Sequence, residues 1–267
     1  MKYRITTESG IFLNDRFIYK GTAVQDWDIQ LFGGIMMPYS YSKGYRLLIT
    51  CCNNPHTDFT GYNFFDQLSE LLNKPSEKLE IILNSELNYL TVKNQDEILS
   101  VWNETKEQIV DNFGTGEDIV AVMEEREMAL KNISDEMMDS LLHHICILSF
   151  GKRKKSQMNI PSVLSIENQV LVEPIRMNGK QENPVIYTGE GRLRDKSQAK
   201  KQYNELLQGV IENAKFNYAY DLSIEYSYRA DSLFMEKAVT KIKEQASEKY
   251  YYEQTILFEK LKEEEHE

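Results

Sequence analysis

The sequence predicts an α+β protein, because two different periods of hydrophobic residues occur in separate parts of the chain. Residues 218–229, YAYDLSIEYSYR, have Tyr, Leu or Ile at every even position and small or polar residues at every odd one. Strand side chains alternate between two faces, so this stretch predicts a half-buried, antiparallel strand with Leu222 and Ile224 in the core. From residue 94 to 151 the apolar residues recur at helical spacing instead.

Three consecutive parts are expected from these patterns: a β-rich N-terminal part over residues 1–93, a helical segment over 94–151 and an α+β C-terminal part over 152–267. A single composite domain is the alternative, because a chain of 267 residues fits one large or two ordinary domains.

The N-terminal part begins with a predicted hairpin. Two short apolar runs, 11–13 and 17–19, flank the turn-forming pair Asn14-Asp15. Further patterns in this part predict strands over 27–31, 45–51, 79–83 and 87–92, with a helix over 64–72.

The helical segment is expected to contain three amphipathic helices. The first ends at Gly114, where a left-handed cap can terminate it, and the second begins after Thr115. Ser134 can cap the third, which ends before Gly151.

The C-terminal part is expected to consist of a helix over 197–215, the strand over 218–229 and a long helix. Residues 231–265 contain no Gly or Pro, and apolar residues such as Met235, Val239 and Ile242 recur at helical spacing. Three consecutive tyrosines on a helix cannot all face one core, so we expect part of this helix to bind a protein partner or a second copy. The predicted interface residues are Met235, Val239, Ile242, Tyr250, Tyr251, Tyr252, Leu257 and Leu261.

Composition indicates a soluble, cytoplasmic protein. Hydrophobic residues make up 41% of the chain and charged residues 27%, which is typical of globular proteins. The first residues lack the apolar core of a signal peptide, and no run of apolar residues is long enough to span a membrane. Three cysteines without disulfide or metal spacing fit a reducing compartment. Frequent Lys, Asn, Ile and Tyr suggest a bacterial or phage origin.

The distribution of charge is uneven. The net charge is −11, yet residues 151–201 contain eleven basic and five acidic residues, against 20 basic and 37 acidic in the rest. The basic residues can be a solvated helix end, an intramolecular partner for the acidic helices, or a surface that binds an anion such as a nucleic acid or nucleotide. The anion-binding candidates are Lys152, Arg153, Lys154, Lys155, Arg192, Arg194, Lys200 and Lys201. Gly189-Glu190-Gly191 precedes them, as a plain loop or as a phosphate-binding turn.

Known catalytic motifs are missing from the sequence, and no cofactor is implied. One metal site is conceivable between two helices, where Glu124, Glu127, Asp139 and His143 supply oxygen and nitrogen ligands. The alternative is that these residues form a solvated acidic helix face.

Three functional hypotheses follow. The first is a non-enzymatic binding protein, such as an adaptor, inhibitor or assembly component, that acts through protein–protein contacts. The second is nucleic-acid or nucleotide binding through residues 152–201. The third is a metal-dependent hydrolase. The absence of a catalytic constellation places the enzyme hypothesis last.

Overall fold

A computed structural model of the chain describes residues 1–36, 43–57, 63–150, 156–179, 182–207, 210, 215–230 and 232–262. These residues are dominated by a large antiparallel sheet, with 46% of them in strands and 32% in helices. The predicted α+β fold, with a central three-helix segment and a helix–strand–long helix unit at its C-terminus, is therefore wrong.

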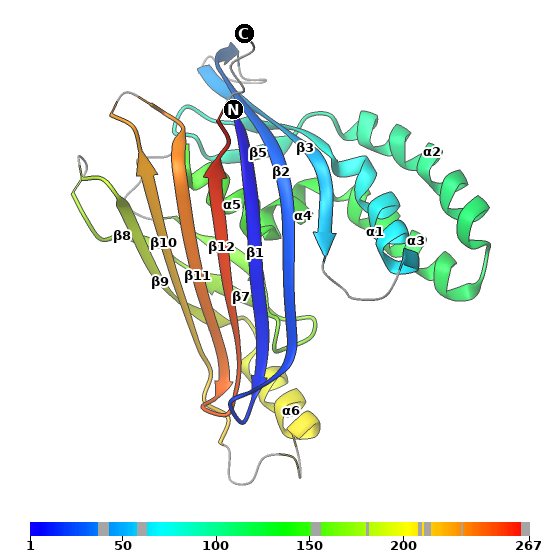
Figure 1. Cartoon of the computed structure of the whole chain (residues 1–267), viewed down its shortest axis with the longest axis vertical. Helices are drawn as coiled ribbons and strands as arrows, with labels where there is room; N and C mark the ends of the chain where they lie inside the picture. The colour runs from blue at the N-terminus through cyan, green and yellow to red at the C-terminus, as the bar shows by residue number, and fades with distance from the viewer. Residues whose placement is uncertain are drawn as a thin grey trace. The chain divides into compact units, whose positions relative to one another are not determined.

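Twelve strands make up this sheet among the described residues, in the order β5-β4-β3-β2-β1-β12-β11-β10-β9-β7-β6, with β8 also paired to β9 (Figure 1). The strands are β1 (Lys2–Leu13), β2 (Arg16–Met36), β3 (Lys43–Thr57), β4 (Lys78–Leu83), β5 (Tyr89–Val92), β6 (Met158–Pro161), β7 (Gln169–Val172), β8 (Ile175–Arg176), β9 (Val185–Leu193), β10 (Ala219–Tyr228), β11 (Met235–Ser247) and β12 (Tyr250–Lys260).

The chain divides into two compact units, each made of more than one stretch of sequence. Unit 1 consists of Met1–Tyr3, Gln25–Met137 and Leu261–Glu267. Unit 2 consists of Arg4–Val24 and Met138–Lys260. The long strands β1 and β2 contribute residues to both units.

Unit 1 combines β3, β4 and β5 with α1 (Asn63–Asn73), the 3₁₀ helix η1 (Lys74–Ser76), α2 (Gln95–Phe113), α3 (Glu117–Lys131) and most of α4 (Ile133–Asp139), whose last two residues belong to unit 2. The predicted first helix is confirmed, because α2 ends at Gly114, whose positive φ of 78° suits glycine. Its apolar face, which includes Ile98, Trp102 and Ile109, is buried. None of the helices in the described ranges is both long and apolar enough to cross a membrane.

Unit 2 has its core on one face of the sheet. On β10 the predicted alternation is confirmed, with Leu222 and Ile224 buried. Helix α5 (Leu141–Phe150) is hydrogen-bonded to this strand: the Tyr226 hydroxyl donates to the carbonyl of Ile145 at 2.8 Å. We call this the inner face; the outer face carries the odd residues of β10, such as Asp221.

The long C-terminal helix predicted from residue 231 is two paired strands, β11 and β12. Along β11 every second residue is buried on the inner face: Ala238, Thr240, Ile242, Glu244 and Ala246. Thr240 and Glu244 are polar, which hid the alternation in the sequence. The remaining apolar residues lie three or four positions apart, and this spacing resembled the apolar face of a helix.

The predicted hairpin around Asn14-Asp15 is confirmed. Both residues have positive φ, 50° and 59°, as a two-residue turn of this kind requires. On the inner face, Ile11 and Leu13 pack against a buried cluster that contains Tyr203 and Leu207 of α6 (Lys196–Leu207). Figure 1 accordingly shows the hairpin and α6 at the same end of unit 2.

The sequence Gly189-Glu190-Gly191 does not form a loop ahead of a helix. It lies within β9, where Gly191 is in close contact with a neighbouring side chain. A Cβ atom on Gly191 would lie 2.6 Å from Cγ1 of Val170 and 2.7 Å from Cδ1 of Tyr220. These glycines therefore permit tight packing within the sheet rather than phosphate binding.

Candidate binding groove on the outer face of unit 2

An open groove of 850 Å³ crosses strands β8 to β12 on the outer face of unit 2. Its floor is formed by polar side chains of the sheet, and its rim includes Glu173, Ile175 and Met177. Ile175 and Met177 are exposed although apolar. We call this depression the outer groove.

The strand register arranges the floor in two rows. The hydroxyl row consists of Thr188, Ser223, Lys241 and Thr255, which are direct cross-strand neighbours. The charged row consists of Glu190, Asp221, Lys243 and Glu253, which are also direct neighbours. Each residue of one row lies two positions along its strand from a residue of the other, so the rows run about 7 Å apart.

Within the charged row, Lys243 is paired with Glu253, the residue at the β12 end. Its Nζ lies 3.0 Å from Oε1 of Glu253 and 4.4 Å from the ring centroid of Tyr251. The ammonium group is therefore directed towards β12 and shares its charge between a carboxylate and an aromatic ring.

An aromatic cluster continues the outer face beyond Lys243. It consists of Phe12, Phe17 and Tyr251. The rings of Phe12 and Tyr251 stack at 4.6 Å, and Phe12 lies 4.3 Å from Phe17. Phe17 is 59% exposed. Because Lys243 touches both the groove and Tyr251, the outer groove and the aromatic cluster form one surface.

Half of the predicted interface residues are placed in the core. Four of the eight are buried on the inner face of unit 2 and cannot form a contact surface: Met235, Ile242, Tyr250 and Tyr252. The consecutive tyrosines lie on a strand, so Tyr251 alone faces outward. Val239 and Leu257 oppose each other on the outer face and are partly exposed. Leu261 follows β12 in unit 1, where its backbone N–H donates to the carbonyl of Lys2.

The predicted anion-binding residues remain a prediction. Lys152, Arg153, Lys154 and Lys155 lie outside the described residues. The other four are exposed at the end of β9 and on α6: Arg192, Arg194, Lys200 and Lys201. Asp195 caps the start of α6 by accepting the backbone N–H of Gln198 at 2.8 Å. The carboxylate of this chain's own Asp195 thus occupies the positive end of α6.

Three of the four predicted metal ligands have other partners in the structure. Glu127 accepts hydrogen bonds from Lys106, Lys131 and Trp102, which lower the pKa of its carboxyl to about 2. Asp139 accepts a hydrogen bond from the Gln169 side chain at 3.1 Å, and Glu124 is exposed. In the part of the chain that the structure describes, no three His, Cys, Asp or Glu side chains are grouped as a metal site.

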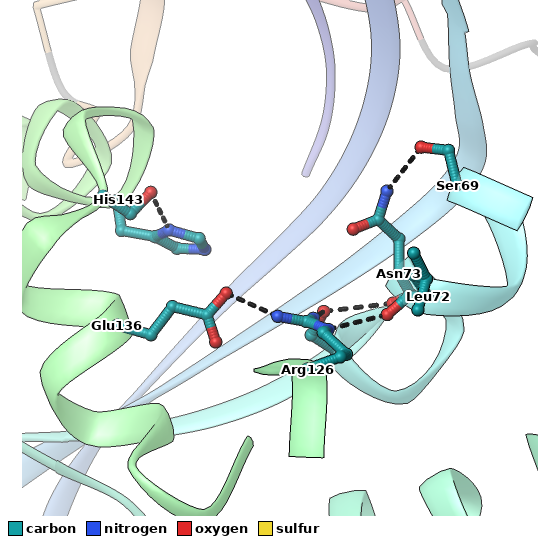
Figure 2. Close-up of polar contacts among 8 residues, drawn as sticks. Ser69, Leu72, Asn73, Arg126, Glu136 and His143 are labelled. Atoms are coloured by element: carbon teal, nitrogen blue, oxygen red, sulfur yellow. Dashed lines mark hydrogen bonds and ion pairs between the residues drawn. The ribbon is translucent and has the colours of Figure 1, made fainter. Parts of the chain in front are cut away.

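His143, the fourth predicted ligand, lies 2.7 Å through its Nδ1 from the hydroxyl of Ser140 (Figure 2). Burial and the neighbouring His144 lower its pKa to about 3, so the imidazole is neutral. The metal hypothesis stays a prediction, without a cluster of ligands to carry it further.

Sequence reasoning missed the buried carboxylate of Glu244. Its oxygens accept hydrogen bonds from the Ser162 hydroxyl at 2.5 Å, the Val163 backbone N–H at 2.9 Å and the Tyr218 hydroxyl at 3.0 Å. Burial is the main influence on this carboxyl and raises its pKa. The sequence carries one signal for it: if residues 235–247 are taken as a strand, their alternation places Glu244 on the inner face.

Comparisons with known proteins give little guidance. No protein-family model matches the chain, and no curated protein is similar to it. One solved structure, described as "lipid-protein interactions in lipovitellin", is similar over 97% of this chain and 24% of its own length, with 8% identity and a TM-score of 0.37. This chain thus spans about a quarter of that protein, and so low a TM-score supports no conclusion about fold or function.

Proposed function

We propose that this chain is a non-enzymatic binding protein that takes a polypeptide partner on the outer face of unit 2. The observation that carries the proposal is the continuous surface formed by the outer groove and the aromatic cluster. That surface combines exposed aromatic and apolar side chains with a polar floor, as protein interfaces do.

The aromatic cluster supplies the anchor of the proposed interface. Phe17 and Tyr251 lie near opposite ends of the sequence, but Phe12 contacts both rings and stacks on Tyr251. Stacked rings are rigid, so a partner that covers them gains apolar contact at little cost in side-chain entropy. Aromatic residues are enriched at protein interfaces, and tyrosine in particular at their hot spots.

The outer groove supplies the polar part. Hydroxyl groups of Thr188, Ser223 and Thr255 can each donate and accept hydrogen bonds with a polypeptide backbone. Ile175 and Met177 on the rim offer an apolar contact beside them. A polypeptide segment matches this mixture of groups better than a purely apolar or a purely anionic ligand does.

Selection of peptides from a random library displayed on phage, followed by fluorescence anisotropy with the synthesised peptides, tests the proposal. We expect the selected peptides to bind the chain, and Phe17→Ser or Tyr251→Ser to weaken binding at least tenfold, which corresponds to about 1.4 kcal/mol.

Met128→Ser is the matched control, because Met128 is 64% exposed on α3 of unit 1. Circular dichroism confirms that each variant is folded. A selection that enriches no peptide would contradict the proposal, and so would equal losses in the control and the two aromatic variants.

A further inference from the structure

We infer, resting on the proposed function, that the partner segment seated in the outer groove is basic, with an arginine or lysine side chain held between Glu190 and Asp221. The inference follows from the charges of the groove and from how its own cations are placed.

Acidic groups outnumber basic groups in the groove. Four carboxylates line it, from Glu173, Glu190, Asp221 and Glu253, against the ammonium groups of Lys241 and Lys243. A positively charged segment therefore complements the groove, while an acidic one meets repulsion.

Glu190 and Asp221 form the focus of this negative charge. They are direct cross-strand neighbours of β9 and β10, and like charges directly opposite each other destabilise a sheet. Among the described residues, no Lys, Arg or His nitrogen lies within 4.0 Å of either carboxylate.

The lysine next to Asp221 does not relieve this repulsion. Lys243 is the other cross-strand neighbour of Asp221, but its Nζ pairs with Glu253 at 3.0 Å and lies over Tyr251. A cation from a partner can therefore neutralise the charges of Glu190 and Asp221. A guanidinium suits this role because its several N–H groups can donate to both carboxylates at once.

The surroundings of the pair suit a long basic side chain rather than a small cation. Ile175 and Met177 lie on the rim of the same groove and can cover the aliphatic stem of an arginine or lysine. Lys241, between the hydroxyls of Ser223 and Thr255, offers a place for a carbonyl or carboxylate of the same segment.

The test uses two labelled pentapeptides, one alternating arginine with valine and the other alternating glutamate with valine. Anisotropy at low and high salt gives their affinities for the intact chain and for the double variant Glu190→Gln/Asp221→Asn. We expect the arginine peptide to bind more tightly than the glutamate peptide, and the double variant to weaken it at least tenfold at low salt.

Glu107→Gln/Asp111→Asn is the matched control, because it removes the same charge from two exposed residues one turn apart on α2. Equal losses in both double variants would show attraction to the net charge alone and overturn the inference. Failure of the arginine peptide to bind, or equal binding of the glutamate peptide, would overturn it as well.

The two proposals can fail separately. If library-selected peptides lose affinity in Phe17→Ser but not in Glu190→Gln/Asp221→Asn, the binding function stands and the basic character of the partner is wrong. If neither the Phe17→Ser variant nor the Glu190→Gln/Asp221→Asn variant changes the affinity for any peptide, the proposed function itself is wrong.

Discussion

Glu244 shows how a single residue can connect distant parts of the chain. Its carboxylate is almost completely buried in unit 2, yet three donors from residues 162, 163 and 218 satisfy it. A buried carboxylate is tolerated when such hydrogen bonds replace water. Glu244 therefore ties the segment after β6 and the residue before β10 to the middle of β11.

The pH dependence of stability is the first prediction at this scale. Burial raises the pKa of Glu244 above its ordinary value of 4.5, so the folded chain holds this proton more tightly than the unfolded chain. The contribution of Glu244 to stability is then largest below pH 4.5 and declines as pH rises through the raised pKa.

Glu244→Gln abolishes this dependence, because the amide does not titrate. We expect it to cost about 1–3 kcal/mol, since an NH₂ group replaces one carboxylate oxygen and cannot accept the hydrogen bonds donated to that oxygen. Urea unfolding from pH 4 to 8 gives the difference between the two proteins. The difference should shrink as pH rises; a difference that grows would mean that the site favours the ionised carboxylate.

At the scale of elements, the packing of β9 depends on Gly191. Val170 of β7 and Tyr220 of β10 leave no room for a Cβ atom there. We expect Gly191→Ala to lower the free energy of unfolding by about 1–3 kcal/mol, the usual range for an overpacked core.

Thermal or urea unfolding measures this effect. Thr188→Ala on the outer face of the same strand serves as the control, because it removes an exposed side chain and should cost less than about 1 kcal/mol. Equal costs for the two variants would show that the close contact at Gly191 is relieved by a small shift of the strands.

Helix α3 is tied to its neighbours in unit 1 by Arg126 (Figure 2). Its Nε donates to the Leu72 carbonyl at 2.8 Å, Nη1 to Glu136 at 2.7 Å and Nη2 to the Ser76 hydroxyl at 2.9 Å. The side chain is only 14% exposed, so the planar guanidinium joins the end of α1, η1 and α4 in a protected position.

We expect Arg126→Ala to destabilise unit 1 by about 2–3 kcal/mol, because two partly buried acceptors and the Glu136 carboxylate lose a charged donor. Arg126→Lys should recover only part of this loss, since one ammonium cannot reach three acceptors in different directions. Urea denaturation followed by circular dichroism checks both values. Full recovery by lysine would mean that charge matters and the fork geometry does not.

For the molecule as a whole, the sequence and the structure agree on an excess of negative charge. The net charge of −11 favours encounter with basic partners and speeds association at low salt. The outer groove repeats the same sign on a local scale, with acidic residues in excess. The binding proposal and the inference about a basic partner both depend on this agreement.

Local patterns in the sequence were enough for several elements. The hairpin over 11–19, the strand over 218–229 and the helix that ends at Gly114 each depend on neighbours in the chain, such as Asn14-Asp15 in the turn. Alternation and turn-forming residues operate within a few positions, so the sequence alone could reveal them.

The last two strands and the groove could not be predicted in this way. Thr240 and Glu244 interrupt the apolar pattern of β11, and the inward position of Glu244 is explained only by Ser162 and Tyr218, which lie far away in the sequence. Likewise, Glu190, Asp221 and Glu253 come into one row with Lys243 only through the register of β9 to β12.

By itself, then, the sequence determined the short-range elements and the acidic balance. The tertiary structure alone decided that residues 235–260 are strands and that the candidate site lies on the outer face of unit 2. The physical reason is that strand pairing joins residues distant in the chain, and neither their hydrogen-bond partners nor their charged neighbours can be inferred from local order.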